Sequence, residues 1–225
     1  MAGLYPFIYK LFTIVKMIKL LGSLVLASGL SSILSTGCAS PQYDSYYNVL
    51  IDPTFSTEDQ TAIVDAVNAW QHITGDGLYL TFNVSVGDPG QCASKPTSHQ
   101  ICIHSTTIGA IENDGASENV FGFTRPYTDG GGEIFIPTAK DAELTYEQLT
   151  TVVSHEVGHS LGLSHTTSVT SNVMYAGFSH AALLPTCGDF QQYIDLRGGT
   201  DFGANPVCPN GGTYALADGK EKMNR

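Results

Sequence analysis

Alternating apolar and polar residues predict several short strands along the chain. Residues 47–52 (YNVLID) alternate in this way, and Pro53 ends the pattern. The same signal recurs in residues 78–86 (LYLTFNVSV), 100–104 (QICIH) and 133–136 (EIFI). The last of these strands follows a glycine-rich loop at residues 128–132 and stops at Pro137.

Apolar residues at helical spacing predict two long helices. The first begins at a capping box formed by Thr57 and Gln60 and ends near Gly75. Its apolar face consists of Ile63, Val64, Val67 and Trp70. The second begins at a capping box formed by Thr145 and Gln148. Its apolar stripe consists of Leu149, Val152, Val153, Val157 and Leu161.

The first 37 residues have the pattern of an export signal. They contain three lysines and no acidic residue, and residues 20–34 are largely apolar. Residues 34–38 (LSTGC) resemble the lipobox of bacterial lipoproteins, in which the cysteine is lipidated, although Ser35 stands where leucine is usual. The alternatives are a plain secretory signal and an uncleaved anchor helix, and Met17 is a second candidate start. We therefore expect an exported protein, either anchored to the cell surface or outer membrane through Cys38 or secreted.

The rest of the chain predicts one catalytic domain. A length of 225 residues with 42% hydrophobic content suits one well-buried domain and is too short for two large ones. We expect a linker at residues 38–45, the domain at residues 46–200 and a tail at residues 201–225. Without the three lysines of the leader, seven basic and 21 acidic residues remain, a formal charge of about −14. Such a surface repels nucleic acid, so we expect no nucleic-acid partner, and we expect a monomer.

Four cysteines follow Cys38, which is an even number in an exported chain. They allow three disulfide connectivities, and sequence alone does not choose among them. We prefer the two local pairs, because each closes a loop rich in Gly, Pro, Ser or Asn: Cys92 with Cys102, and Cys187 with Cys208. Metal binding by thiolates is the weaker alternative, because no C-x-x-C spacing occurs.

Residues 155–165 (HEVGHSLGLSH) carry the candidate chemistry, and they match H-E-x-x-H-x-x-G-x-x-H at all five fixed positions. A chance match in a chain of this length is on the order of one in 10⁴ to 10⁵. Four residues advance a helix by about 400°, so His155 and His159 project from the same face. Gly162 can adopt the left-handed conformation that ends a helix, and the turn would bring His165 to the same ion.

Three neutral ligands leave one tetrahedral position of a zinc ion open to water, which is typical of a catalytic site. Zinc lowers the pKa of that water towards neutrality. Glu156 follows the first ligand directly and is placed to take the proton. The motif therefore predicts one catalytic Zn²⁺ held by His155, His159 and His165, with Glu156 activating a zinc-bound water to hydrolyse a peptide bond.

The motif resembles that of the metzincins, and within them that of the matrixins. Residues 172–175 (NVMY) look like the methionine turn of matrixins, and residues 189–196 (DFQQYIDL) look like their third helix. The resemblance implies a zinc metalloendopeptidase with Met174 beneath the metal ligands. It also implies an α+β fold: a twisted, mostly parallel sheet with an antiparallel edge strand, two long helices, and a small C-terminal subdomain with a third helix.

Several departures from the matrixin pattern refine this expectation. Ala176 stands where astacins and serralysins have a zinc-binding tyrosine, so a fifth ligand is excluded. Gly122 stands where matrixins have a structural-zinc histidine, so we expect no second zinc. Residues 131–133 (GGE) resemble a matrixin calcium loop but lack its aspartates. Ca²⁺ is therefore the weaker hypothesis there, and a flexible hairpin is the alternative.

In this family a peptide substrate adds as an antiparallel strand to an exposed sheet edge. We expect that edge to be formed by Glu133, Ile134, Phe135 and Ile136. We expect the wall of the specificity pocket to include Tyr175, Ala176, Gly177 and Phe178. The substrate would be an extended polypeptide. Two alternatives are a binding module that keeps the metal without catalysis, against which Glu156 argues, and a zinc amidase acting on a non-protein amide.

Overall fold

The computed structural model describes residues 45–76, 79–90, 92, 99–113, 121–128, 130–167, 171–176, 184–197, 208, 213–215 and 221–223. The chain divides into a unit of residues 1–39 and a unit of residues 40–225, and everything below concerns the second unit. The predicted leader, Cys38, Gly177, Phe178 and most of the predicted tail lie outside the described residues.

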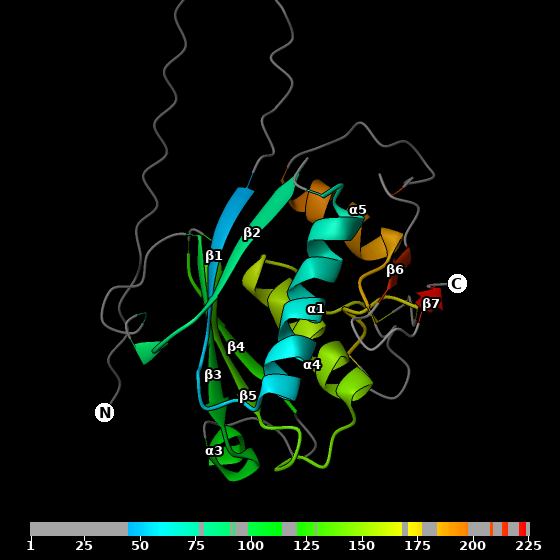
Figure 1. The fold of residues 1–225 in the computed structure, drawn as a ribbon. Coiled ribbons are helices and arrows are strands. Elements are labelled where there is room, and N and C mark those ends of the chain that lie inside the picture. Colours follow the sequence, from blue (N-terminus) through cyan, green and yellow to red (C-terminus); the bar gives the residue numbers. More distant parts are fainter. Residues whose placement is uncertain are drawn as a thin grey trace, which may run out of the picture. The chain divides into compact units, whose positions relative to one another are not determined.

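Helices are interspersed among the strands along the described chain (Figure 1). The strands are β1 (Ser45–Ile51), β2 (Leu80–Val86), β3 (Gln100–Thr106), β4 (Phe123–Pro126), β5 (Gly131–Pro137), β6 (Thr213–Ala215) and β7 (Glu221–Met223). The helices are α1 (Thr57–Ile73), α3 (Ile108–Asn113), α4 (Tyr146–Ser160) and α5 (Cys187–Leu196). No sequence pattern predicted the positions of α3, β4, β6 and β7.

A five-stranded sheet has the order β2-β1-β3-β5-β4. The first four of these strands are parallel, and β4 pairs antiparallel with β5. The predicted α+β fold, with a mostly parallel sheet and an antiparallel edge strand, is therefore confirmed. The prediction that residues 133–136 form the edge is wrong. They lie in β5, which pairs with β3 on one side and β4 on the other, so its backbone groups are already used.

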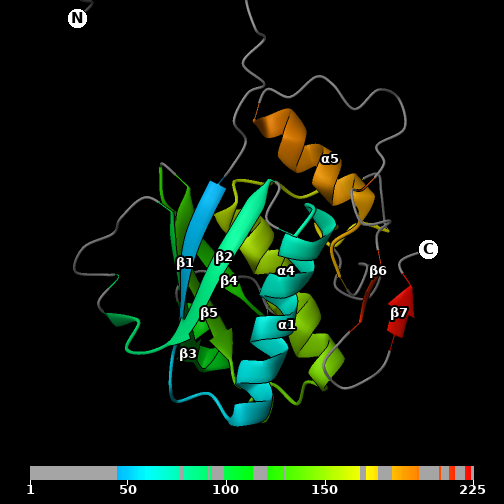
Figure 2. The ribbon, with the colours of Figure 1, turned by 45° about the horizontal axis from the view of Figure 1, so that its top comes forward.

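Helices α1 and α4 lie side by side on one face of this sheet, as Figures 1 and 2 show from two directions. Between the helices and the sheet lies a continuous apolar core that includes Trp70, Ile103, Ile134 and Val153. Burial of these side chains is the main favourable term that holds the layers together. The indole N–H of Trp70 donates to the Ser154 carbonyl oxygen over 2.8 Å and so fixes α1 against α4.

The start of α1 differs from the prediction by one residue. Ser56 is the N-cap, and its hydroxyl accepts a hydrogen bond from the backbone N–H of Asp59 over 3.1 Å. Thr57 is the first helical residue, and its carbonyl accepts a bond from the Thr61 hydroxyl. The predicted capping box of Thr57 and Gln60 is therefore wrong. Serine and threonine both cap well, so the pattern alone did not separate neighbouring candidates.

The glycines before residue 133 belong to the sheet. Gly131, with φ of +89°, begins β5, and a β-carbon at this position would overlap the Gln100 carbonyl oxygen. A β-carbon on Gly132 would lie 2.7 Å from the Arg125 carbonyl oxygen. Glycine is therefore required where β3 and β4 approach the start of β5 closely. The predicted strand begins two residues earlier than the apolar pattern indicated.

Both preferred disulfides are present, one between Cys92 and Cys102 and the other between Cys187 and Cys208. Cys102 lies in β3, and Cys187 is the first residue of α5. The predicted local pairing is confirmed, and each bond attaches a loop or the C-terminal segment to a regular element.

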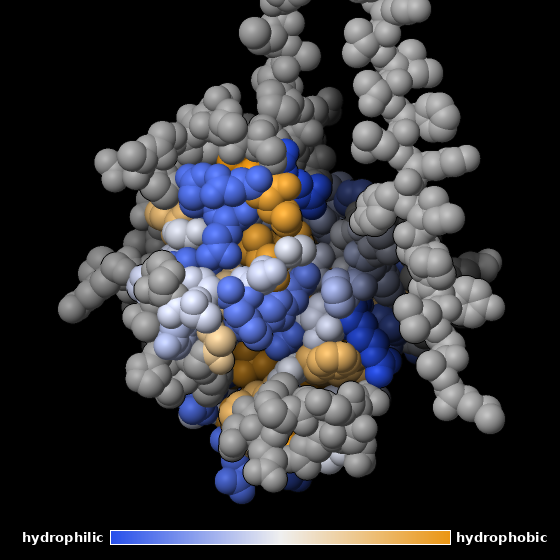
Figure 3. Space-filling model, turned by 180° about the vertical axis from the view of Figure 1, so that it is seen from behind, coloured by the Kyte–Doolittle hydropathy of each residue, from blue (hydrophilic) through white to orange (hydrophobic). Residues whose placement is uncertain are grey.

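Among the residues that the structure describes, no helix combines the length and the apolar character needed to cross a membrane. The large apolar side chains most exposed among them are Tyr46, Val86 and Leu196, which lie far apart in the sequence. Figure 3 shows the molecule from behind, and apolar areas there alternate with hydrophilic ones.

Candidate metal centre

Helix α4 places the first two histidines. The Thr145 hydroxyl accepts from the Gln148 backbone N–H, and the Gln148 side chain accepts in return from the Thr145 N–H, so the predicted capping box is confirmed. Leu149, Val152, Val153 and Val157 face the core, as the apolar stripe predicted. The opposite side of the last two turns therefore carries His155 and His159, one turn apart.

A tight turn after α4 places the third histidine. Gly162 has φ of +94°, and its N–H donates to the His159 carbonyl oxygen over 2.9 Å. The Leu163 N–H donates to the Gly158 carbonyl oxygen over 3.0 Å, so the chain reverses directly at the helix end. Thr166 then donates its N–H to the Met174 carbonyl oxygen over 2.8 Å. His165 therefore lies between the hydrogen-bonded turn at Gly162 and the bond from Thr166 to Met174. The turn at Gly162 confirms the prediction from the motif.

The three imidazoles converge on one point. The Nε2 atom of His165 lies 3.0 Å from that of His155 and 3.1 Å from that of His159. One ligand atom from each histidine lies within 4.8 Å of the others. In a tetrahedral zinc site with Zn–N bonds of about 2.0–2.1 Å, neighbouring nitrogens are about 3.3 Å apart. The spacing of the histidine nitrogens fits such an ion.

Hydrogen bonds on the far side of two rings set their tautomers. Nδ1 of His155 lies 2.7 Å from the Val173 carbonyl oxygen, and Nδ1 of His159 lies 2.8 Å from the Leu163 carbonyl oxygen. A carbonyl oxygen only accepts, so Nδ1 carries the proton in both neutral rings and Nε2 presents a lone pair. Such backbone bonds are the usual way in which a protein orients metal-binding histidines.

The surroundings also keep the two rings neutral. Burial lowers the pKa of His155 to about 4, with the neighbouring His159 and His165 adding to this effect against the opposing bond to Val173. Burial likewise lowers the pKa of His159, with His165 adding to it and the bond to Leu163 opposing it. A neutral imidazole is the form that binds a metal ion. The donor set, its spacing and its protonation therefore fit zinc.

The turn at residues 172–175 packs directly against α4. Met174 is fully buried, and a β-carbon on Gly158 would overlap its sulfur atom. Gly158 lies between His155 and His159 in the sequence, so Met174 packs against the helix segment that carries both ligands. Only a glycine at this position allows so close an approach.

The side chain of Asp189 fixes this turn through hydrogen bonds, a role that the sequence alone did not predict. Its carboxylate accepts bonds from the backbone N–H groups of Val173 (3.0 Å), Met174 (3.1 Å) and Thr186 (2.8 Å). Because the Val173 carbonyl in turn accepts from His155, Asp189 supports a metal ligand at one remove. The available signal was the capping-box spacing of Thr186 and Asp189 at the start of α5.

The side chain of Glu156, which follows His155 directly in the sequence, is a buried carboxyl group. Its residue is 6% exposed, and burial raises its pKa to about 7 against the lowering effect of a hydrogen bond from Thr124. The Thr124 hydroxyl lies 2.6 Å from Oε2 of Glu156. A β-carbon on Gly122 would lie 2.8 Å from Cγ of Glu156, so that glycine leaves room for the side chain. The segment at β4 thus shapes the surroundings of Glu156, and no local sequence signal marked Thr124.

The predicted substrate-binding residues do not gather at one place. Ile134 and Ile136 lie in the core, and Glu133 and Phe135 therefore face the other side of the sheet. Glu133 contacts the His104 ring there, with its Oε1 3.3 Å from Nε2. Tyr175 is the last residue of the methionine turn and Ala176 follows it; an isolated parallel β-bridge joins Tyr175 to Thr166.

Calcium finds no support at the glycine-rich start of β5. Across the described ranges, the histidine triad is the only group of three or more His, Cys, Asp or Glu side chains that could share one ion.

Comparisons with known proteins identify a family for the chain. A family model described as matrixin matches residues 47–185, which is more than half of the chain. A solved structure of an archaemetzincin from Methanopyrus kandleri is 15% identical, with a TM-score of 0.45, and the match covers 71% of this chain and 99% of that one. A search of curated protein sequences gave no match.

Proposed function

The chain belongs to the matrixin family and is a zinc metalloprotease, and from this premise we propose that it is an endopeptidase that cleaves extended polypeptides. The observation that carries the proposal is the convergence of three imidazoles: Nε2 of His165 lies 3.0 Å from that of His155 and 3.1 Å from that of His159. The buried carboxyl group of Glu156 lies on the helix that carries the first two histidines.

His155, His159 and His165 would hold the zinc ion. When bound, zinc would acidify a water molecule and polarise the carbonyl group of the substrate. The protein's contribution is to keep the two α4 histidines neutral and fixed through Val173 and Leu163. Three protein ligands leave a position open, as catalysis requires.

Glu156 would act as the general base and then as the general acid. It would take the proton of the attacking water and pass it to the leaving amine. A pKa raised to about 7 by burial suits a group that both accepts and returns a proton near neutral pH. Thr124 supports this role, because its hydroxyl bond leaves the carboxyl group little rotational freedom.

The substrate would add to β4, which replaces residues 133–136 as the candidate edge. Among the described strands β4 pairs only with β5, which makes its outer side the candidate for binding an extended backbone. The inward-facing Thr124 of the same strand contacts Glu156, so a peptide on this edge would pass close to the proposed base. Tyr175 and Ala176 remain candidates for the pocket wall.

Export and anchoring are part of the proposal. The apolar segment at residues 20–34 and the lipobox-like residues 34–38 support lipidation of Cys38, and several acyl chains anchor a protein stably. Mass spectrometry of the mature N-terminus tests this, and an unmodified terminus beyond Cys38 would exclude it. We propose that the mature protein is a monomer, which sedimentation would check.

Cleavage of casein by the mature protein tests the proposed function, with zinc content measured in parallel. We expect fragments from internal cleavage, and we expect Glu156→Ala to lose cleavage while it retains zinc. Thr150→Ala is a matched control on the same helix, because within the described part of the chain the Thr150 hydroxyl donates to the Tyr146 carbonyl oxygen of its own helix. Bound zinc without cleavage of any peptide would favour a binding module instead.

A further inference from the structure

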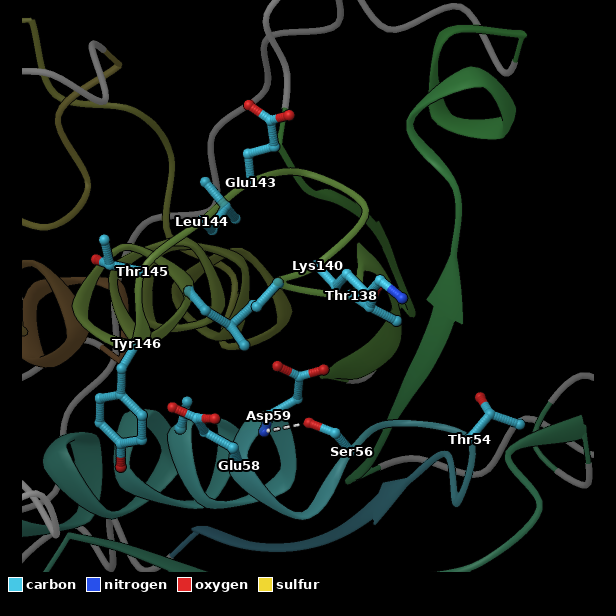
Figure 4. A pocket seen from close by; sticks show the side chains of 13 residues that line it. Thr54, Ser56, Glu58, Asp59, Thr138, Lys140, Glu143, Leu144, Thr145 and Tyr146 are labelled. Atoms are coloured by element: carbon cyan, nitrogen blue, oxygen red, sulfur yellow. Dashed lines mark hydrogen bonds between the residues drawn. The ribbon is translucent and has the colours of Figure 1, made fainter.

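A cavity of about 550 Å³ lies where the first turns of α1 and α4 meet the segment of residues 138–145 (Figure 4). Its volume is within the range of about 300–1,000 Å³ that is usual for small-ligand pockets. It lies at the N-terminal end of α4, whereas His155 and His159 are near the C-terminal end. None of the three histidines nor Glu156 lines it, so it is separate from the candidate metal centre.

The carboxylate of Asp59 points into this cavity. Figure 4 shows it directed from α1 towards the segment that precedes α4. Asp59 is only 5% exposed, and its backbone N–H is used by Ser56. Among the described residues the structure records no hydrogen bond or ion pair to the carboxylate itself. A carboxylate that faces a cavity in this way can accept hydrogen bonds from a positively charged ligand.

The charges around the cavity favour a cation. Glu58, Asp59 and Glu143 contribute three negative charges, and Lys140 contributes one positive charge. The N-terminal ends of α1 and α4 add roughly half a positive charge each. The balance is therefore about one negative charge. In Figure 4 the Lys140 ammonium group points away from Asp59, so this side chain does not fill the space beside the carboxylate.

The remaining lining suits an alkyl chain. Ala62, Ala139, Leu144 and Leu149 supply the apolar part of the lining. Thr138 and Thr145 also belong to the lining; their hydroxyl groups already accept from the backbone N–H groups of Asp141 and Gln148, and each oxygen keeps one further lone pair. A lining that combines apolar side chains with a carboxylate and hydroxyl groups suits a methylene chain that ends in an ammonium group.

We propose that this pocket binds a primary alkylammonium group, such as a lysine side chain of a polypeptide or a free diamine. The methylene chain lies along Ala139 and Leu144, and the ammonium group donates to Asp59. This binding does not depend on peptidase activity.

Titration of the zinc-loaded protein with small probes, followed by ¹⁵N NMR, tests the proposal. The probes are Nα-acetyl-lysine methylamide, 1,5-diaminopentane and Nα-acetyl-norleucine methylamide, which has the alkyl chain without the ammonium group. With the two amines we expect saturable chemical-shift changes in the first turns of α1 and α4, with dissociation constants of roughly 1 mM or more. We expect no such changes with the norleucine amide. Tighter binding of the lysine amide would indicate a polypeptide source, and tighter binding of the diamine a free amine. Shifts elsewhere, no shifts, or equal shifts with norleucine would overturn the proposal.

Two variants isolate the contacts. Asp59→Asn keeps the size of the side chain and removes its charge, and we expect binding to weaken at least about tenfold. Ala139→Leu keeps Asp59 but fills the space, and we expect the same loss. Glu147→Gln is the matched control, because it removes an acidic group from the first turn of α4 that does not line the cavity. Unchanged binding in Asp59→Asn, with the same unfolding temperature as the wild type, would refute the assignment.

Discussion

Thr124 and Glu156 meet where the edge strand crosses α4, and their contact explains how a buried carboxyl group keeps one orientation. The hydroxyl oxygen of Thr124 lies 2.6 Å from Oε2 of Glu156 and 3.1 Å from the backbone carbonyl oxygen of Glu156. A hydrogen bond to a charged acceptor contributes about 1.5–3 kcal/mol. Thr124 is therefore a positioning residue for the proposed base.

The first prediction concerns this bond. Thr124→Val keeps the shape of the side chain and removes the hydroxyl, so we expect kcat for peptide cleavage to fall about tenfold. KM and zinc content should stay unchanged, because neither the edge backbone nor the histidines are altered. Thr124→Ser keeps the hydroxyl and should restore kcat. A Val variant that changes KM and leaves kcat intact would show that Thr124 contacts the substrate instead.

The second prediction concerns the pH dependence of stability in the metal-free protein. Folding raises the pKa of Glu156 from 4.5 to about 7, so between these values the folded protein binds more protons than the unfolded chain. Its stability is therefore lost as the pH rises through this window. Glu156→Gln removes the titration, and above pH 7 it should be more stable than the wild type by about 3 kcal/mol.

Urea unfolding at several pH values measures this difference. Below pH 4.5 the two proteins should have nearly equal free energies of unfolding, because both side chains are then neutral. The control is Glu58→Gln, which removes an exposed carboxylate and no buried one. A constant difference between wild type and Glu156→Gln at every pH would contradict the assigned shift.

At the scale of elements, the contact between α4 and the methionine turn depends on a missing side chain. Gly158→Ala would place a methyl group on the Met174 sulfur and 3.1 Å from the Trp70 ring. Overpacking of a filled core typically costs about 1–3 kcal/mol. We expect urea unfolding to show a loss of stability of about this size in the variant. We also expect weaker zinc binding, since the turn that supports His155 must shift.

Gly109→Ala is the matched control for this third prediction. Gly109 lies in α3, and a β-carbon there would have no atom within 4 Å. Alanine favours a helix over glycine by about 1 kcal/mol, so this variant should be neutral or slightly stabilising. If the two variants had equal stabilities, close packing at Gly158 would not be the reason for its glycine.

The parts of the fold that were predictable are those set by local rules. The motif at residues 155–165, with its helix and its glycine turn, follows from helical periodicity and backbone sterics. By contrast, β4 has only four residues and gains its pairing from β5, which no local pattern encodes. Thr124 and Asp189 act on residues distant in the sequence, so their roles appear only once the chain has folded.

At the scale of the whole molecule, the metal should contribute to stability as well as to chemistry. Zinc that binds only the folded chain stabilises it by about 4 kcal/mol when the free zinc concentration is 1,000 times the dissociation constant. For a domain of this size, chelation should therefore lower the unfolding temperature by roughly 10 °C. Differential scanning calorimetry with a chelator, then with zinc restored, measures this fourth prediction. His165→Ala should show little response to zinc, and an unchanged wild-type temperature would argue against a site formed by the folded chain.

The position of β4 at the edge of the described sheet has a further consequence for how the molecule behaves in solution. An unpaired strand that accepts a peptide could equally accept the same strand of another copy, and aggregation would follow. Here β4 is four residues long, carries the exposed Arg125 and ends at Pro126, which has no N–H to donate. A short length, a charged side chain and a proline are the usual features that prevent exposed edge strands from pairing with other copies. The strand can therefore bind one guest chain without nucleating a growing sheet.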